Sequence, residues 1–157
     1  MFLHETGSYL HPDDPGEPST GLPRLSVTDE EAALLTEWVA GMTVLEIGTG
    51  LGVSTRALAE SAVTVHTVDV DLWVHEMIWP YLPDNVVPHK TVGTVPMVDA
   101  AFIDGDHSLE AVAWDLAQAT SRASKLLMAH DYHPTEEALG DGWEVMPTAH
   151  GLARKFL

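Results

Sequence analysis

Two short segments of the sequence gather carboxylates and imidazoles, the groups that bind metal ions and move protons. They are residues 104–107 (DGDH) and residues 130–133 (HDYH). Carboxylate oxygens are the ligands that hard divalent cations prefer, and a histidine among them moves the preference toward Mn, Fe, Co, Ni or Zn. A histidine with an ordinary pKa of about 6.5 also accepts protons near neutral pH. The two segments indicate metal binding or general base catalysis, with turn residues and solvated charges as the alternative.

A glycine-rich loop lies between a predicted strand and a predicted helix. Its glycines are Gly48, Gly50 and Gly52. Glycine allows tight turns and lets a ligand touch the backbone, and the free N–H groups at a helix start attract anionic groups. Asp69 follows Gly48 by 21 residues, at the end of the next predicted strand. An acid there can accept two hydrogen bonds from a ribose diol, although Asp69 as a simple helix N-cap is the alternative. Together these features predict a site for an adenosine cofactor.

The spacing of the glycines distinguishes between adenosine cofactors. Dinucleotide-binding loops follow G-x-G-x-x-G/A, whereas this loop reads G-x-G-x-G and has Val53 at the third small position. Glu46, two residues before the first glycine, would sit poorly beside a pyrophosphate. Its carboxylate suits the ammonium group of S-adenosylmethionine, whose own carboxylate would meet the helix start and the Ser54 hydroxyl. The loop therefore favours S-adenosylmethionine over NAD.

The elements that must position these groups alternate between strands and helices. Helix starts are indicated by a capping box at Thr28 and Glu31 and by a Ser108 N-cap. We expect helices over 28–41, 53–61, 72–80 and from 108, and strands over 43–47, 62–68, 85–91, 99–104, 125–129, 143–146 and 152–157. This order predicts a Rossmann-like α/β fold, a doubly wound and mostly parallel seven-stranded sheet with a C-terminal antiparallel strand pair. Ligands of such sheets bind at the carboxyl ends of the strands, where the acidic segments lie.

Composition and charge restrict the function. The 157 residues fit one domain, which we expect over 27–157 behind an N-terminal arm or loop over 1–26. The formal charge of −17 repels phosphates and anionic lipids, which argues against nucleic acid and membrane partners. The absence of cysteine excludes disulfides and a cysteine nucleophile. Because the sequence shows no signal peptide and no membrane-spanning run, we expect a cytoplasmic protein. Helical spacing assigns Trp38 and Trp114 to the core.

Four segments together resemble a known family. The glycine motif within Val44–Ala59 and the second motif Val65–Asp71 are similar to those of class I S-adenosylmethionine-dependent methyltransferases. Within this class, Phe102–Ser108 and Leu127–Tyr132 resemble the small metal-dependent O-methyltransferases of the catechol and antibiotic sugar-methylating types. The resemblance covers roughly residues 28–157.

The resemblance implies roles for individual residues. The implied cofactor-binding residues are Glu46, Gly48, Thr49, Gly50, Gly52, Ser54, Asp69 and Asp104. His107 and Asp104 are the implied catalytic residues, with His107 as the base, and Asp104, Asp131 and, as a third candidate, His130 are the implied ligands of Mg, Mn or another divalent metal. The chain departs from the family at His130, where an acid is common, at Tyr132, where asparagine is common, and at 92–94, where the acid that often contacts adenine is missing.

These observations predict an enzyme that transfers the methyl group of S-adenosylmethionine to the oxygen of a small hydroxylated molecule, with or without a metal. A metal-independent methyltransferase for nitrogen or another acceptor, and a non-catalytic cofactor-binding module, stay open as alternatives. We expect a small-molecule acceptor as partner. A homodimer is a further expectation, because a short domain can complete its acceptor pocket with the arm of a neighbouring subunit.

Overall fold

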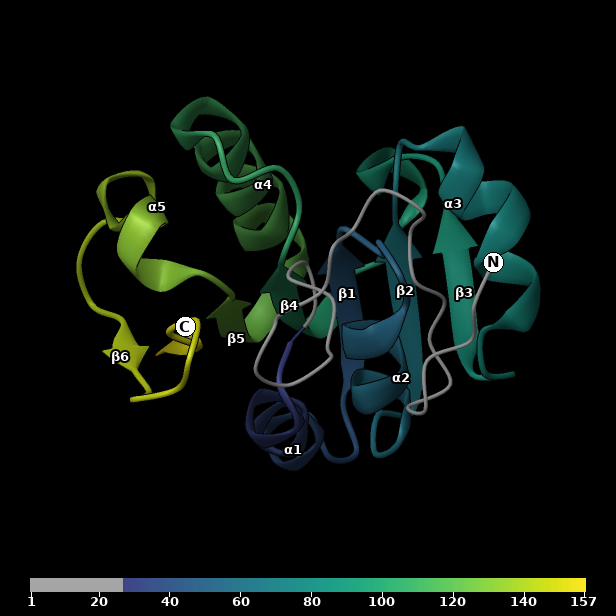
Figure 1. Ribbon diagram of the computed structural model, residues 1–157, viewed down its shortest axis with the longest axis horizontal. Coiled ribbons are helices and arrows are strands. Elements are labelled where there is room, and N and C mark those ends of the chain that lie inside the picture. The colour runs from purple at the N-terminus through teal and green to yellow at the C-terminus, as the bar shows by residue number, and fades with distance from the viewer. Residues whose placement is uncertain (1–26) are drawn as a thin grey trace.

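The computed structural model describes residues 27–157, so the predicted arm over 1–26 lies outside the described residues (Figure 1). The helical elements are α1 (Asp29–Trp38), α2 (Val53–Ala59), α3 (Leu72–Met77), η1 (Trp79–Tyr81), η2 (Val92–Thr94), α4 (Leu109–Arg122) and α5 (Tyr132–Leu139). The strands are β1 (Thr43–Ile47), β2 (Thr64–Val68), β3 (Val86–His89), β4 (Val98–Ile103), β5 (Ala123–Ala129), β6 (Glu144–Val145) and β7 (Ala153–Phe156).

The described strands form one seven-stranded sheet in the order β3-β2-β1-β4-β5-β7-β6. The first five strands in this order are parallel, and β7 runs antiparallel to both β5 and β6. In register, Ile47 pairs with both Val68 and Ile103, and Ile103 pairs with Ala129. The carboxyl ends of β1, β2, β4 and β5 therefore meet at one edge of the sheet. The predicted fold class is confirmed.

Side-chain caps that the sequence predicts define where two of the helices begin. In α1, the Glu31 N–H donates to Thr28 Oγ1 over 3.3 Å and the Thr28 N–H donates to the Glu31 carboxylate over 2.9 Å, which is the predicted capping box. In α4, the Ala111 N–H donates to Ser108 Oγ, as predicted. The sequence analysis did not predict α5, because its N-cap residue Asp131 has a left-handed backbone and makes no side-chain cap bond.

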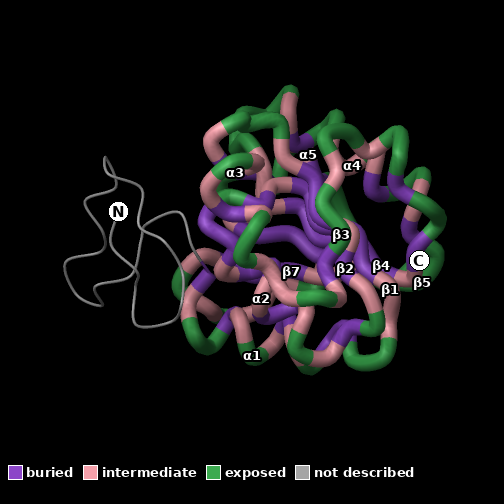
Figure 2. The backbone as a smooth tube through the Cα atoms, turned by 90° about the vertical axis from the view of Figure 1, so that its right-hand side faces the viewer, coloured by how far each residue is buried: buried purple, intermediate pink, exposed green. Residues whose placement is uncertain are grey.

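The core has two parts, one on each face of the sheet. Alternate strand residues such as Val44 and Phe102 pack with α1 and α2, and the intervening residues such as Leu45 and Ala101 pack with α4. Buried backbone accordingly runs through the centre of the molecule (Figure 2). Trp38 is buried, but Trp114 is 67% exposed, so its predicted place in the core is wrong. Within the described residues, no helix combines the length and hydrophobicity that a membrane span requires.

Candidate functional site

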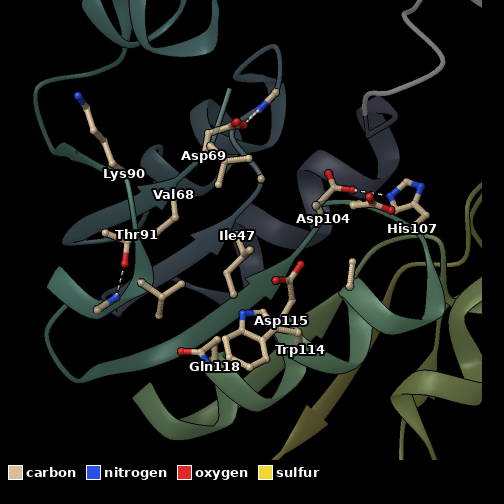
Figure 3. Close-up of a pocket in the computed structure, with 18 residues that line it drawn as sticks. Ile47, Val68, Asp69, Lys90, Thr91, Asp104, His107, Trp114, Asp115 and Gln118 are labelled. Atoms are coloured by element: carbon tan, nitrogen blue, oxygen red, sulfur yellow. Dashed lines mark hydrogen bonds and ion pairs between the residues drawn. The ribbon is translucent and has the colours of Figure 1, made fainter. Parts of the chain in front are cut away.

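A cavity of about 550 Å³ opens at the carboxyl edge of the sheet (Figure 3). Its wall includes the ends of β1 and β2, the turn after β3, the segment after β4, and one face of α4. Of the predicted cofactor-binding residues, Gly48, Gly50, Asp69 and Asp104 line it, together with the predicted base His107. The volume lies in the usual range for small-molecule sites.

The glycine loop carries the chain from β1 into α2 by a path that needs glycine. Gly48, Gly50 and Gly52 all have a positive φ, of 98°, 48° and 79°. A Cβ atom on Gly48 would overlap the backbone carbonyl of Asp104 on the neighbouring strand end. The Gly48 N–H donates to the Val68 carbonyl over 2.8 Å. The loop therefore lies directly between the ends of β2 and β4.

Asp69 ties the end of β2 to this loop. Its Oδ2 accepts from the Gly50 N–H over 3.0 Å, and its Oδ1 accepts from the Asp71 N–H over 2.8 Å. The N-cap of α3 is Asp71, whose side chain accepts from the Trp73 N–H. The alternative role of Asp69 as a helix N-cap is therefore wrong, and its half-buried carboxylate borders the cavity.

Glu46 lies beneath the loop rather than at the cavity wall. Its side chain is fully buried, and it accepts three hydrogen bonds of 2.6 Å from the hydroxyls of Ser54, Thr55 and Thr67. Burial outweighs these donors and raises the pKa of Glu46 to about 7. The Thr49 hydroxyl is hydrogen-bonded to Thr67. Glu46, Ser54 and Thr49, which we predicted to contact the cofactor, thus belong to one buried cluster of hydrogen-bonded side chains. Their direct contact with a cofactor stays a prediction.

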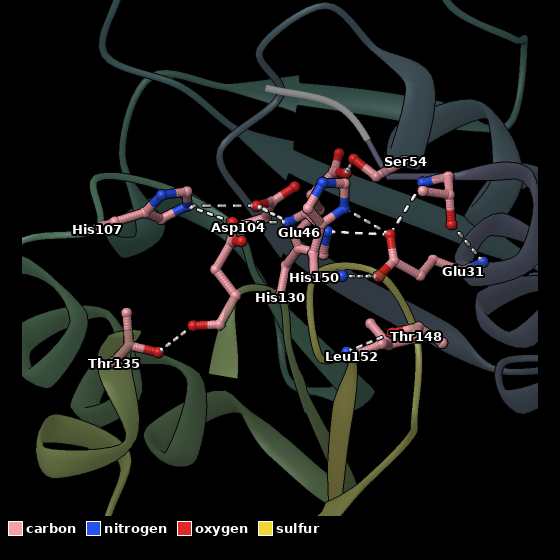
Figure 4. A network of polar contacts seen from close by, with 12 residues as sticks. Glu31, Glu46, Ser54, Asp104, His107, His130, Thr135, Thr148, His150 and Leu152 are labelled. Atoms are coloured by element: carbon pink, nitrogen blue, oxygen red, sulfur yellow. Dashed lines mark hydrogen bonds and ion pairs between the residues drawn. The ribbon is translucent and has the colours of Figure 1, made fainter. Parts of the chain in front are cut away.

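Asp104, His107 and Asp131 come together beside the cavity (Figure 4). The His107 Nε2 lies 3.3 Å from Asp131 Oδ2 and 3.6 Å from Asp104 Oδ1, and the imidazole is 40% exposed. A hydrogen bond with Asp104 raises the pKa of His107 against the opposing effect of burial. One ligand atom from each of the three residues lies within 4.8 Å of the other two. Two carboxylates and one imidazole form a donor set that fits a divalent cation.

His130 is held between carboxylates on both sides of its ring. Its Nδ1 lies 3.0 Å from Asp104 Oδ1 and 3.1 Å from Asp131 Oδ2, and its Nε2 lies 3.2 Å from Glu31 Oε2. Although burial disfavours the imidazolium, these hydrogen bonds raise the pKa of His130 to about 12. A doubly protonated ring has no lone pair for a metal. The candidate donor set beside the cavity is therefore Asp104, His107 and Asp131, whereas His130 contacts the same two aspartates as a hydrogen-bond donor, and metal binding by His130 stays untested.

Glu31 is a site residue that sequence reasoning missed. Its fully buried carboxylate contacts His130 and also accepts from the backbone N–H and the Nδ1 of His150, both over 3.0 Å. Burial opposes ionisation, but the hydrogen bonds from His130, Thr28 and His150 hold the pKa of Glu31 well below its usual range. The capping box identified Glu31 only as a helix-start residue. No sequence signal links it to His130, 99 residues away.

Two other residues of the segments 104–107 and 130–133, Asp106 and His133, do not join the carboxylate and histidine cluster. Asp106 is exposed, and its side chain accepts from the Ser108 N–H over 2.7 Å, which is the ordinary role of a turn residue. His133 is the other histidine of the second segment, and its ring packs against Gly151 and Tyr132 rather than joining the carboxylates. The candidate donor set beside the cavity thus takes Asp104 and His107 from the first segment and Asp131 from the second, and His130 contacts both aspartates.

Comparisons with known proteins identify the fold. No protein-family model and no curated protein matches the sequence. The O-methyltransferase from Bacillus cereus in complex with S-adenosylhomocysteine (SAH) aligns with a TM-score of 0.72 at 16% identity, over 88% of this chain and 86% of that chain. TomG, an O-methyltransferase from Streptomyces achromogenes in complex with S-adenosylmethionine, aligns with a TM-score of 0.66 at 14% identity, over 87% and 83%.

A third solved structure shows how widely this fold is used. The precorrin 8w decarboxylase of Methanobacterium thermoautotrophicum aligns with a TM-score of 0.65 at 15% identity, over 100% of both chains. These likenesses establish that residues 27–157 have the Rossmann-like fold of class I methyltransferases. Because one fold carries different activities, the reaction has to be argued from the site.

Proposed function

We propose that the chain is an S-adenosylmethionine-dependent methyltransferase that methylates a hydroxyl oxygen of a small molecule. One observation carries the proposal. A single cavity joins the glycine turn and Asp69, which suit an adenosine cofactor, to Asp104 and His107, which suit proton removal. The complexes of the Bacillus and Streptomyces O-methyltransferases with SAH and S-adenosylmethionine support this choice of cofactor.

Asp69 and the glycine turn are the proposed anchors of the cofactor. The two Asp69 oxygens lie at the end of β2, in hydrogen-bonding contact with backbone N–H groups. A ribose diol would donate two further hydrogen bonds to the same carboxylate. The backbone of Gly50 leaves room for close approach, because nothing lies within 4 Å of the place that its Cβ would take. The buried Glu46 cluster holds the turn in this shape from below.

His107 is the proposed general base. Its Nε2 points to Asp104 and Asp131, which orient the ring and stabilise the imidazolium form. Its Nδ1 then accepts the proton that the acceptor hydroxyl loses as the oxygen takes the methyl group. A well-placed base of this kind contributes about 10²–10⁴-fold to a rate.

A divalent cation fits the same cluster. Asp104 and Asp131 would hold it, with His107 as a third ligand, and the cation would lower the pKa of the acceptor hydroxyl. One observation favours the metal-independent alternative, since the His130 imidazolium already compensates the charges of both aspartates. A chelator separates the two mechanisms. Unchanged methyl transfer in EDTA favours His107 as base, and a loss that Mg²⁺ or Mn²⁺ restores favours the metal.

Calorimetry with SAH and with NAD tests the cofactor assignment. We expect SAH to bind and NAD not to bind. Asp69→Asn should weaken SAH binding by about 1.5–3 kcal/mol, because hydrogen bonds to a charged group are lost. Asp71→Asn is the matched control, because Asp71 caps α3 and does not line the cavity. Binding of NAD without SAH, or equal SAH affinity in the Asp69 variant, would contradict the assignment.

The acidic charge supports the remaining parts of the proposal. The formal charge of −17 disfavours nucleic acids and anionic membranes as partners, which supports a small molecule as the acceptor, and a cytoplasmic location is part of the proposal. Sedimentation at low and high protein concentration tests the proposed homodimer. A mass of 17.0 kDa at every concentration would contradict it.

A further inference from the structure

The face of α4 that borders the cavity carries a carboxylate that has no partner among residues 27–157. Asp115 lines the cavity together with Trp114 and Gln118 (Figure 3). Within residues 27–157, the Asp115 carboxylate makes no hydrogen bond and no ion pair, although the side chain is partly buried. Burial and the nearby charge of Asp106 raise the pKa of Asp115 to about 6. An acid in this position destabilises the empty protein, and such groups concentrate at functional sites.

The position of Asp115 relative to Asp69 indicates which part of a nucleoside it would meet. Figure 3 shows Asp69 above Ile47, and Asp115 beside Ile47 toward the helix that carries Trp114. The same cavity is also lined by Val92 of η2 and by α4, and the base of a ribose held at Asp69 would lie in the space between them. Asp115 lies on the far side of this space, and its Oδ2 would stand 2.9 Å from a Cβ on Gly105. Gly105 thus leaves room for this carboxylate at the edge of the base.

The walls of this space suit a purine. Ile47, Val68, Val92 and the ring of Trp114 supply apolar surface, and α4 adds the polar side chains of Asp115 and Gln118. The exposure of Trp114, at 67%, leaves its ring available to cover a bound base. A carboxylate accepts hydrogen bonds and donates none when ionised. It therefore favours a base with an amino group and disfavours a base with a carbonyl at the same place.

The segment after β3 offers no competing acid. Residues 90–98 read KTVGTVPMV and contain neither Asp nor Glu. Lys90, Thr91, Val92 and Gly93 line this part of the cavity instead. Of the two elements that border this space, η2 thus contributes no carboxylate and α4 contributes that of Asp115.

We propose that Asp115 determines the base specificity of this site by accepting a hydrogen bond from the 6-amino group of adenine. This inference rests on the proposed function, because it takes the cavity to be the nucleoside site. The residue acts on recognition and takes no part in methyl transfer.

Calorimetry with two ligands tests the inference. The ligands are SAH and its 6-oxo analogue S-inosylhomocysteine, which differ only at position 6 of the base. We expect the wild-type protein to prefer SAH at least about tenfold. Asp115→Asn should lose this preference, because an amide can donate to a 6-oxo group as well as accept. Glu110→Gln is the control, since it removes a charge from α4 outside this cavity and should keep the wild-type preference.

The outcomes separate the two proposals. If wild type binds neither ligand, the proposed function fails and this inference fails with it. If wild type binds SAH but Asp115→Asn keeps the full preference, only the role of Asp115 is overturned. Thermal unfolding gives a second measurement. Asp115→Asn should raise the unfolding midpoint at pH 7.5 and raise it by clearly less at pH 4.5, whereas a lower midpoint at both values would identify a structural residue and overturn the proposal.

Discussion

The buried Glu46 carboxylate makes folding stability depend on pH in a predictable way. In the folded protein its pKa is raised to about 7, mainly by burial, against about 4.5 for an exposed glutamate. Between these values the folded state holds one proton more than the unfolded state. Stability therefore falls as pH rises, by up to about 1.4 kcal/mol per pH unit. Over the 2.5 units between the two values, this amounts to about 3 kcal/mol.

Glu46→Gln isolates this contribution. A glutamine has the shape of the protonated glutamate, and the hydroxyls of Ser54, Thr55 and Thr67 can accept from its amide as they would from the protonated acid. We expect the variant to match wild type within about 1 kcal/mol at pH 5, on the usual scale of one hydrogen bond. At pH 8 the variant should be more stable than wild type by about 3 kcal/mol.

Urea unfolding followed by tryptophan fluorescence at pH 5, 6, 7 and 8 measures both proteins. Other titrating groups, such as the histidines, are common to both, so the difference between the two curves reports on Glu46. Glu37→Gln, an exposed change on α1, is the control and should give a difference that does not vary with pH. Parallel curves for wild type and Glu46→Gln would refute the reasoning, because Glu46 would then not take up a proton on folding.

Two further predictions concern the turn and the buried network. Gly48→Ala should destabilise the protein by more than about 3 kcal/mol in urea unfolding, because the added Cβ would overlap the Asp104 backbone. Gly41→Ala is the control: its φ of +74° is also positive, but its Cβ would have open space, so the variant should lose only about 1–2 kcal/mol. Equal losses in the two variants would contradict the steric argument. Glu31→Ala should cost about 3–5 kcal/mol by leaving the buried His130 imidazolium without one of its carboxylates. A loss no larger than that of an ordinary capping change, about 1 kcal/mol, would show that His130 does not need Glu31.

Local signals in the sequence were enough to predict most elements of the fold. The capping box at Thr28 and the Ser108 N-cap act within a few residues, and the strand over 43–47 has the predicted bounds. The second strand and the third helix are shorter than predicted, because local patterns define the ends of elements poorly. The helix α5 was missed because its start carries no side-chain cap.

The candidate site was predictable in its parts and not in its arrangement. The sequence alone determined that glycines follow the first strand and that acids end the second and fourth, since these are properties of neighbouring residues. Only the tertiary structure decided that Glu46 faces inward to three hydroxyls, that Glu31 reaches His130, and that Asp115 borders the cavity. Strand order and helix packing set the direction of each side chain. Contacts between residues far apart in the chain fix both, and no local pattern encodes them.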